Sequence, residues 1–147
     1  MSKGGERCPL CSAPHSEGFF EDHLRPYQRC RFCGLVFVPA SYFLSAKQER
    51  SQYDLHQNDP ADQNYRGFLA PAYSAVCERV VLPARGLDYG AGPGPTLSVM
   101  LQESGYEMSI YDVFYANDRT ALERTYHFIT CTEVAEHLHH PDQVFTQ

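Results

Sequence analysis

The spacing of apolar side chains changes along the chain, and each change predicts a different kind of structure. In the first forty residues the apolar positions fall in short runs, which are typical of brief strands. Short strands are expected at Phe19–Phe20, Tyr27–Arg29 and Leu35–Val38. Residues 41–58 are mainly polar, so they predict a short exposed helix followed by a loop.

A longer helix is predicted from about Asn64 to Val81. Apolar side chains recur there at steps of three and four residues, which gathers them on one face of a helix. Pro71 lies inside this stretch, and we expect it to split or kink the helix because proline lacks the backbone N–H.

Beyond residue 84 short apolar runs alternate with helical patterns. Strands are predicted at 86–89, 108–111 and 128–132, and helices begin at Pro95 and at Glu133. This strand–helix–strand order predicts an α/β fold with a parallel sheet, whose strands are joined by a right-handed crossover.

Charge is unevenly distributed. The net charge of the 147 residues is −6, but residues 1–50 carry +2 and residues 51–147 carry −8. The acidic second part argues against a general nucleic-acid binder. No apolar run approaches the roughly 20 residues that span a bilayer, and the N-terminus lacks the apolar segment of a secretory signal. We therefore expect a cytoplasmic protein that does not enter membranes.

Four of the six cysteines form two C-x2-C pairs, Cys8 with Cys11 and Cys30 with Cys33, separated by eighteen residues. This spacing is typical of a structural zinc site with four thiolate ligands, and the pattern resembles a zinc ribbon. Gly34 follows the second pair and suits the turn, because glycine tolerates a positive φ. The alternatives are disulfides, which the lack of a secretory signal disfavours, and iron in place of zinc.

We expect no catalysis at this site, because four thiolates leave no open coordination position. A ribbon of about forty residues buries little core, so the metal is expected to supply most of its stability. Cys131 lies in an apolar run and is expected to be a buried, unreactive thiol. Cys77 lies in the predicted helix and is assigned no role.

A glycine-rich turn lies between the first predicted strand of the α/β region and its helix. It reads Asp88-Tyr89-Gly90-Ala91-Gly92-Pro93-Gly94. Glycines let the backbone approach a ligand closely, and the following helix offers free N–H groups. Asp112 comes eighteen residues after Gly94, at the end of the next strand, where a carboxylate can accept both hydroxyls of an adenosine ribose. NAD and S-adenosylmethionine share this arrangement, but Pro95 fits the NAD fingerprint poorly.

The segment from Asp88 to Gly94 resembles the first motif, D/E-x-G-x-G-x-G, of class I S-adenosylmethionine-dependent methyltransferases. Residues 126–138 are similar to that family's fourth strand and the turn after it, which many members write as an apolar strand followed by E-x-x-E-H-L. Together with the ribbon, the chain resembles bacterial methyltransferases that carry an N-terminal zinc ribbon. The resemblance implies a Rossmann-like fold and S-adenosylmethionine as cofactor. It also implies cofactor contacts from Asp88, Gly90, Ala91, Gly92, Gly94, Asp112, Thr132 and Glu133.

The chain is therefore predicted to consist of a zinc ribbon at 1–40, a helical linker or lid at 41–83 and a partial Rossmann-like domain at 84–147. Fifteen residues separate Asp112 from Phe128, too few for the helix and third strand that the family has there. We expect three strands in the family order 2-1-4, with an exposed apolar edge on the last one. The family's later strands are missing, so we expect a C-terminally truncated chain, a fold that a partner completes or a degraded gene product. The exposed sheet edge is also expected to allow a homo-oligomer.

Glu133, Glu136 and His137 are the candidate catalytic residues. On a helix they occupy positions i, i+3 and i+4 and share one face. By resemblance to methyltransferases with the same E-x-x-E-H motif, they could position Mg²⁺ against a substrate hydroxyl. The alternatives are metal-free catalysis with His137 as general base, and a pocket lining without chemistry. His139 and His140 are expected to be solvated loop residues.

The predicted function is methyl transfer from S-adenosylmethionine to an unidentified acceptor, a small molecule in the first instance, with RNA or protein as alternatives. Catalysis would rest on positioning, because the methyl group of this cofactor is already activated. A non-catalytic binding module is the second hypothesis, and an NAD-linked oxidoreductase is the third. Tyr53 or Tyr65 is expected to lie near the cofactor as part of the lid.

Overall fold

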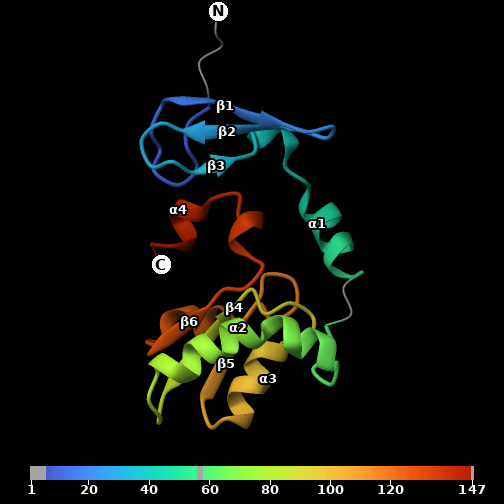
Figure 1. Cartoon of the computed structure of the whole chain (residues 1–147), viewed down its shortest axis with the longest axis vertical. Helices are drawn as coiled ribbons and strands as arrows, with labels where there is room; N and C mark the ends of the chain where they lie inside the picture. Colours follow the sequence, from blue (N-terminus) through green and yellow to red (C-terminus); the bar gives the residue numbers. More distant parts are fainter. Residues whose placement is uncertain (1–5, 56–57, 147) are drawn as a thin grey trace, which may run out of the picture. The chain divides into compact units, whose positions relative to one another are not determined.

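The computed structural model describes residues 6–55 and 58–146, and the chain forms two compact units (Figure 1). The first unit contains the described residues up to Ser45 together with those from His137 onward, and the second unit extends from Ala46 to Glu136. Each unit has its own sheet and its own buried side chains. The domain boundaries expected at residues 40 and 83 remain predictions.

The first unit is built on a small antiparallel sheet in the order β1-β2-β3. Its strands are β1 (Ser16–Glu21), β2 (Pro26–Cys30) and β3 (Val36–Phe37), which overlap the three short runs predicted for the ribbon. The unit also contains the 3₁₀ helix η1 (Ala40–Tyr42) and the helix α4 (Pro141–Val144). Its buried cluster is small and consists of Phe37 and two of the four paired cysteines, Cys8 and Cys30.

Two helices open the second unit. The predicted short exposed helix is α1 (Ala46–Tyr53), which has no buried residue. The longer one is α2 (Gln63–Arg79), whose first turn is capped by the Asp62 carboxylate, which accepts the N–H of Asn64. Pro71 is expected to split or kink this helix, and the split is wrong: α2 continues through Pro71, because its apolar face packs on the core on both sides of that residue. A kink at Pro71 stays a prediction.

The second unit's sheet is parallel and has the order β5-β4-β6. Its strands are β4 (Arg85–Tyr89), β5 (Glu107–Tyr111) and β6 (Phe128–Thr130), and α3 (Thr96–Glu103) connects the first two. This confirms the α/β fold and the predicted order 2-1-4. Residues 113–127 contain the 3₁₀ helix η2 (Arg119–Glu123) and, as expected from their number, no strand.

Apolar side chains cover both faces of this sheet, because successive side chains of a strand point to opposite faces. One face carries a cluster with α2 and α3, centred on the fully buried Leu101. The opposite face carries a smaller cluster of Leu87, Tyr111 and Ala121, which η2 covers. Beside it Ile129 of the edge strand β6 remains 63% exposed, so the predicted apolar edge is present.

The prediction that a helix begins at Glu133 is wrong. Strand β6 ends at Thr130, and the only helical turn within 131–138 is the 3₁₀ helix η3 (Ala135–His137). Glu133 has a φ of 55°, in the left-handed region, which a right-handed helix cannot contain. No helix in the described part of the chain is long and apolar enough to cross a membrane.

Candidate functional site

The glycine-rich turn joins β4 to α3 at the carboxyl end of the parallel strands. Gly90 and Gly92 both have positive φ, 76° and 67°, which explains why these positions are glycine. The N–H groups of Gly90 and Ala91 donate to the carbonyl of Tyr111, at 2.7 and 3.3 Å. The turn therefore starts against the end of β5, where ligands of open α/β sheets bind.

Two distant segments lie against this turn, and sequence reasoning missed both. A Cβ at Gly90 would overlap the side chain of Val134, which follows β6. A Cβ at Gly94 would overlap the backbone carbonyl of Asn58, which precedes α2. The sequence indicated only a turn at Asn58, and nothing in its local pattern signals a contact with the glycines.

Asp112 is placed where the sequence predicted, directly after β5 at the rim of the turn. It is 8% exposed. Its Oδ2 accepts the N–H of Gly92 at 2.9 Å, and its Oδ1 accepts the N–H groups of Phe114 and Tyr115 at 2.8 and 3.1 Å. Because a carboxylate offers about four acceptor positions, hydroxyls of a bound ribose would share these oxygens with the Gly92 N–H.

Asp88 lies beneath the turn and is 3% exposed. Its Oδ1 accepts the hydroxyl of Thr130 at 2.8 Å and its Oδ2 accepts the hydroxyl of Ser98 at 3.1 Å. Burial raises the pKa of this carboxyl, although the two hydroxyls oppose the shift. Asp88 thus ties β4 to β6 and α3, and direct contact with a cofactor remains a prediction for it.

Helix α1 is attached to the turn that Asp112 begins. The Tyr115 hydroxyl donates to Oδ1 of Asp54 at 2.5 Å, and the guanidinium of Arg50 lies 5.9 Å from the centre of the Tyr115 ring. The rings of Tyr53 and Phe114 are 6.1 Å apart. Tyr53 therefore lies close to the turn that Asp112 begins, because its neighbour Phe114 donates its N–H to Asp112, and its expected position near a cofactor stays a prediction.

The tyrosines named as lid candidates face negative charge. Burial, and then the charges of Glu49, Asp112 and Glu136, raise the pKa of Tyr53. Burial, followed by the charges of Asp88 and Glu133, raises the pKa of Tyr65.

The residues after β6 do not form the predicted catalytic face. Thr132 and Glu133 precede η3, whereas Glu136 and His137 lie in it, so the three candidate catalytic residues are not on one helix. The side chains of Glu133, Glu136 and His137 are exposed. Their assignment to catalysis and the assignment of Thr132 to the cofactor stay predictions.

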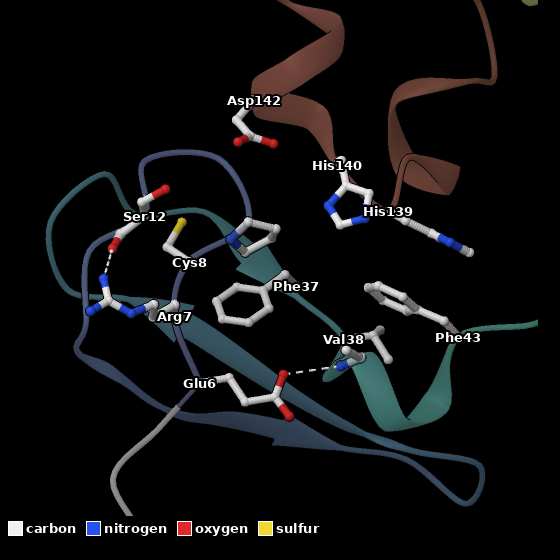
Figure 2. Close-up of a pocket in the computed structure, with 12 residues that line it drawn as sticks. Glu6, Arg7, Cys8, Ser12, Phe37, Val38, Phe43, His139, His140 and Asp142 are labelled. Atoms are coloured by element: carbon white, nitrogen blue, oxygen red, sulfur yellow. Dashed lines mark hydrogen bonds between the residues drawn. The ribbon is translucent and has the colours of Figure 1, made fainter.

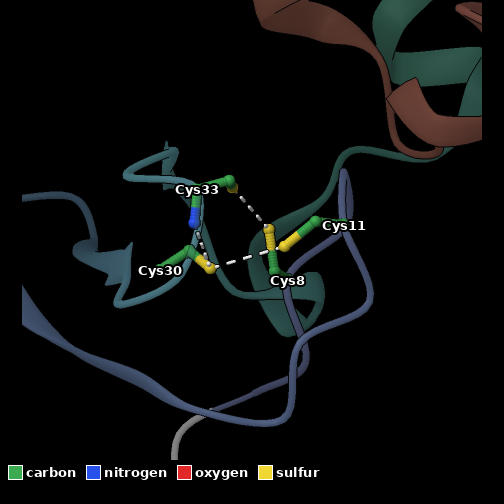
Figure 3. A group of neighbouring side chains, drawn as sticks. All are labelled: Cys8, Cys11, Cys30 and Cys33. Atoms are coloured by element: carbon green, nitrogen blue, oxygen red, sulfur yellow. Dashed lines mark hydrogen bonds between the residues drawn. The ribbon is translucent and has the colours of Figure 1, made fainter.

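The four paired cysteines of the first unit converge, as Figure 3 shows. Among the described residues they are the one group of potential metal ligands whose atoms all lie within 4.8 Å of one another. The Sγ atoms of Cys8 and Cys33 are 3.6 Å apart, and so are those of Cys11 and Cys30. A disulfide needs roughly 2.05 Å, whereas tetrahedral Zn–S bonds of about 2.3 Å separate the sulfurs by roughly 3.8 Å. The donor set and its geometry therefore fit zinc.

Backbone groups favour the thiolate form of Cys30, whereas for Cys11 the backbone hydrogen bond of Ala13 is outweighed by burial and the neighbouring thiols, which raise its pKa to about 12. The N–H groups of Cys33 and Phe32 point to Sγ of Cys30 at 3.5 and 3.4 Å and lower the pKa of that thiol to about 6. Gly34 has a φ of 79°, which confirms its predicted role in the turn.

The first unit also contains a cavity of about 250 Å³ (Figure 2). The rings of Phe43 and His139 stack on one side of it, with centroids 4.3 Å apart and an angle of 13° between planes. The expectation that His139 is a solvated loop residue is therefore wrong, because η1 brings Phe43 against it. Hydrogen bonds from the Ala40 N–H to Glu6 and from Arg7 to the Ser12 carbonyl fix other residues of its lining.

A comparison with protein families places this geometry in context. A family model described as a methyltransferase domain matches residues 45–147, which is more than half of the chain. The matched range includes the glycine turn, Asp112 and the segment after β6 but not the four cysteines. No curated protein and no solved structure gave a significant match.

Proposed function

Because the chain belongs to the methyltransferase-domain family, we propose that its second unit binds S-adenosylmethionine and supports methyl transfer to a small-molecule acceptor. The observation that carries this proposal is the glycine turn at the carboxyl end of β4, which donates the Gly92 N–H to the buried carboxylate of Asp112. An NAD-linked oxidoreductase and a non-catalytic module are not favoured, since the family match is to methyltransferases.

The residues present fit this cofactor. At Gly92 the absence of a side chain leaves room beside the turn before α3, because only the Asn58 side chain lies within 4 Å of a Cβ position there, and Asp112 offers acceptors for ribose hydroxyls. When bound, S-adenosylmethionine supplies a methyl group that its sulfonium charge already activates. We assign the backbone of Gly90, Ala91, Gly92 and Gly94 to binding, with Asp88 supporting the turn from below and with Thr132 and Glu133 closing the site.

The protein's own residues then have to hold and orient the cofactor and the acceptor. Positioning alone can account for most of the rate of such a transfer, because a well-oriented pair of reactants reacts far faster than a free pair. We assign His137 to the acceptor side, where its ring could take the proton that a hydroxyl or amine acceptor loses. Glu133 and Glu136 would orient the acceptor, either directly or through Mg²⁺.

For the first unit we propose one structural Zn²⁺ held by Cys8, Cys11, Cys30 and Cys33. The convergence of four free thiols supports this proposal. It also supports a cytoplasmic location, where thiols stay reduced. We further propose that two copies associate through the edge strand β6, where Ile129 is exposed.

Calorimetric titration of S-adenosylhomocysteine into the zinc-loaded chain tests the cofactor site. We expect micromolar binding, and we expect Asp112→Asn to weaken it at least about tenfold, because charged acceptors form the stronger hydrogen bonds. Asparagine keeps one of the two acceptor oxygens, so its amide nitrogen would face either the Gly92 N–H or the N–H groups of Phe114 and Tyr115, and circular dichroism has to establish that this variant folds.

Asp118→Asn is the matched control, because Asp118 caps η2 by accepting the Thr120 N–H and asparagine caps a helix equally well. Its affinity should equal that of the unaltered chain. A folded, zinc-replete chain that does not bind S-adenosylhomocysteine would exclude the proposed cofactor site.

A further inference from the structure

The cavity of the first unit is enclosed by three segments that are far apart in the sequence (Figure 2). They are the start of the ribbon with its first C-x2-C turn, the stretch from β3 through η1 to Phe43, and residues within 139–142, which lead into α4. Its volume of about 250 Å³ suits a ligand smaller than a drug-sized molecule. None of the residues assigned to the cofactor lines this cavity, so it is separate from the proposed cofactor site.

Hydrogen bonds and packing preform the cavity. The Ser12 N–H donates to the carbonyl of Cys8 at 2.9 Å, which closes the first C-x2-C turn. The Phe43 N–H donates to the carbonyl of Ala40 at 3.1 Å, and the Phe43 ring stacks on His139. Because each segment is fixed by contacts within the protein, the cavity does not depend on a ligand for its shape.

The charged groups of the cavity leave a negative balance. Its lining contains two carboxylates, Glu6 and Asp142, and one guanidinium, Arg7, which sum to a formal charge of −1 when the imidazoles are neutral. The Arg7 guanidinium is turned to the carbonyl of Ser12, to which it donates at 3.0 Å. Cys8 also lines the cavity, and four thiolates around the proposed Zn²⁺ add a formal charge of −2 beside it. The cavity therefore attracts cations and repels anions.

Asp142 supplies the carboxylate that is available to a ligand. Its side chain is half-buried and has no hydrogen bond or ion pair within 6–55 and 58–146, the part of the chain that the structure describes. In the view of Figure 2, the carboxylates of Asp142 and Glu6 lie on opposite sides of the buried Phe37 ring. The negative faces of aromatic rings attract organic cations, and a half-buried carboxylate attracts them more strongly than an exposed one does.

We propose that this cavity binds the alkylammonium group of a small organic cation, a role that goes beyond the function proposed for the second unit. The Asp142 carboxylate would accept hydrogen bonds from the ammonium group, and the rings of Phe37 and Phe43 would contact the alkyl carbons next to it. Among the described residues only the four cysteines converge closely enough to hold a metal ion, so the carboxylates and imidazoles of the cavity do not form a site for one.

Three probes of the same chain length test the charge preference: butylammonium, butyrate and 1-butanol. They are titrated into the isotope-labelled, zinc-loaded chain at about pH 7.5, where imidazole groups are ordinarily neutral, and amide signals are followed by nuclear magnetic resonance. We expect butylammonium to cause saturable shifts at Val38, Phe43 and Asp142 and to bind at least about tenfold more tightly than butyrate. Nα-acetyl-lysine amide is a further probe, because tighter binding of it than of butylammonium would assign the ammonium group to a lysine side chain of a partner.

Asp142→Asn keeps the size of the side chain and removes its charge. We expect it to weaken butylammonium by roughly three- to tenfold and to leave the affinity for 1-butanol unchanged. Glu6→Gln is the second variant and should act in the same direction, because its amide oxygen can still accept the Ala40 N–H. The spectrum of each variant reports whether it folds.

Glu21→Gln is the matched control, because it removes one negative charge at an exposed position of β1 outside the cavity. It should leave the affinity for butylammonium unchanged. An equal loss in Glu21→Gln and Asp142→Asn would reduce the effect to general charge attraction and overturn the proposal. Equal affinities for butylammonium and butyrate, or shifts confined to residues outside the cavity, would also overturn it. None of these outcomes bears on the binding of S-adenosylhomocysteine, so the two proposals fail separately.

Discussion

At the scale of single residues, replacing either of two glycines of the second unit by alanine should change the stability in opposite directions. Gly90 has a positive φ, and a Cβ there would overlap Val134, so Gly90→Ala should lower the free energy of unfolding by about 1–3 kcal/mol. Gly67 lies inside α2 with no atom within 4 Å of a Cβ position, so Gly67→Ala should raise the free energy of unfolding by about 0.5–1 kcal/mol. Urea unfolding of both variants measures the difference. A stabilising Gly90→Ala would show that the contact with Val134 does not persist in solution.

Asp88 is a residue whose charge is unfavourable in the folded state. Burial raises its pKa above the ordinary value of an aspartic acid, so the folded state favours the protonated carboxyl, and stability falls as the pH rises through the folded pKa. Asp88→Asn keeps partners for Ser98 and Thr130, whose hydroxyls can rotate to donate or accept. We expect this variant to gain stability relative to the unaltered chain as the pH rises from about 4 to 7. Urea midpoints at several pH values check this, and a relative loss with rising pH would contradict it.

At the scale of elements, α1 depends on a few contacts with the turn after β5. Burial, and then the Asp54 carboxylate, raise the pKa of Tyr115 to about 12, so its hydroxyl stays a donor to Asp54 at physiological pH. Tyr115→Phe removes a hydrogen bond of about 0.5–1.5 kcal/mol. Amide exchange within α1 should accelerate by roughly two- to tenfold as a result, while exchange in α3 stays unchanged.

Tyr126→Phe is the matched control for this change, because the Tyr126 hydroxyl donates to the Ala121 carbonyl of η2. It should accelerate exchange in η2 and leave α1 unaffected. Equal protection of α1 in both variants would mean that the Tyr115–Asp54 bond contributes nothing to the attachment of α1.

At the scale of the whole molecule, the two units should respond differently to metal removal. The first unit buries only a small cluster that contains two of the four cysteines proposed to bind zinc, so a chelator should unfold it. The second unit has a larger core without such ligands and should keep its exchange protection. Cys11→Ser should abolish stoichiometric zinc binding, whereas Cys77→Ser, at an exposed position of α2, should preserve it. Loss of amide-exchange protection in β4–β6 after addition of the chelator would contradict the expectation that the two units unfold independently.

Local features of this protein were determined by the sequence itself. The C-x2-C pairs, the three short ribbon strands and the strand–helix–strand order around the glycine turn could all be predicted, because each depends on residues close together in the chain. The same holds for Asp112, since the length of one βαβ unit places the end of the second strand beside the turn. Even the missing third strand followed from the number of residues available.

Contacts between distant segments were decided only by the tertiary structure. Asn58 over the glycine turn, Val134 against Gly90 and His139 stacked on Phe43 join parts of the chain that no periodic pattern relates. Glu133 illustrates the reason: its sequence is compatible with a helix, but the packing of its neighbour Val134 accompanies a left-handed backbone there. Periodicity reports which face of an element is buried, whereas the partner on that face depends on how the elements assemble.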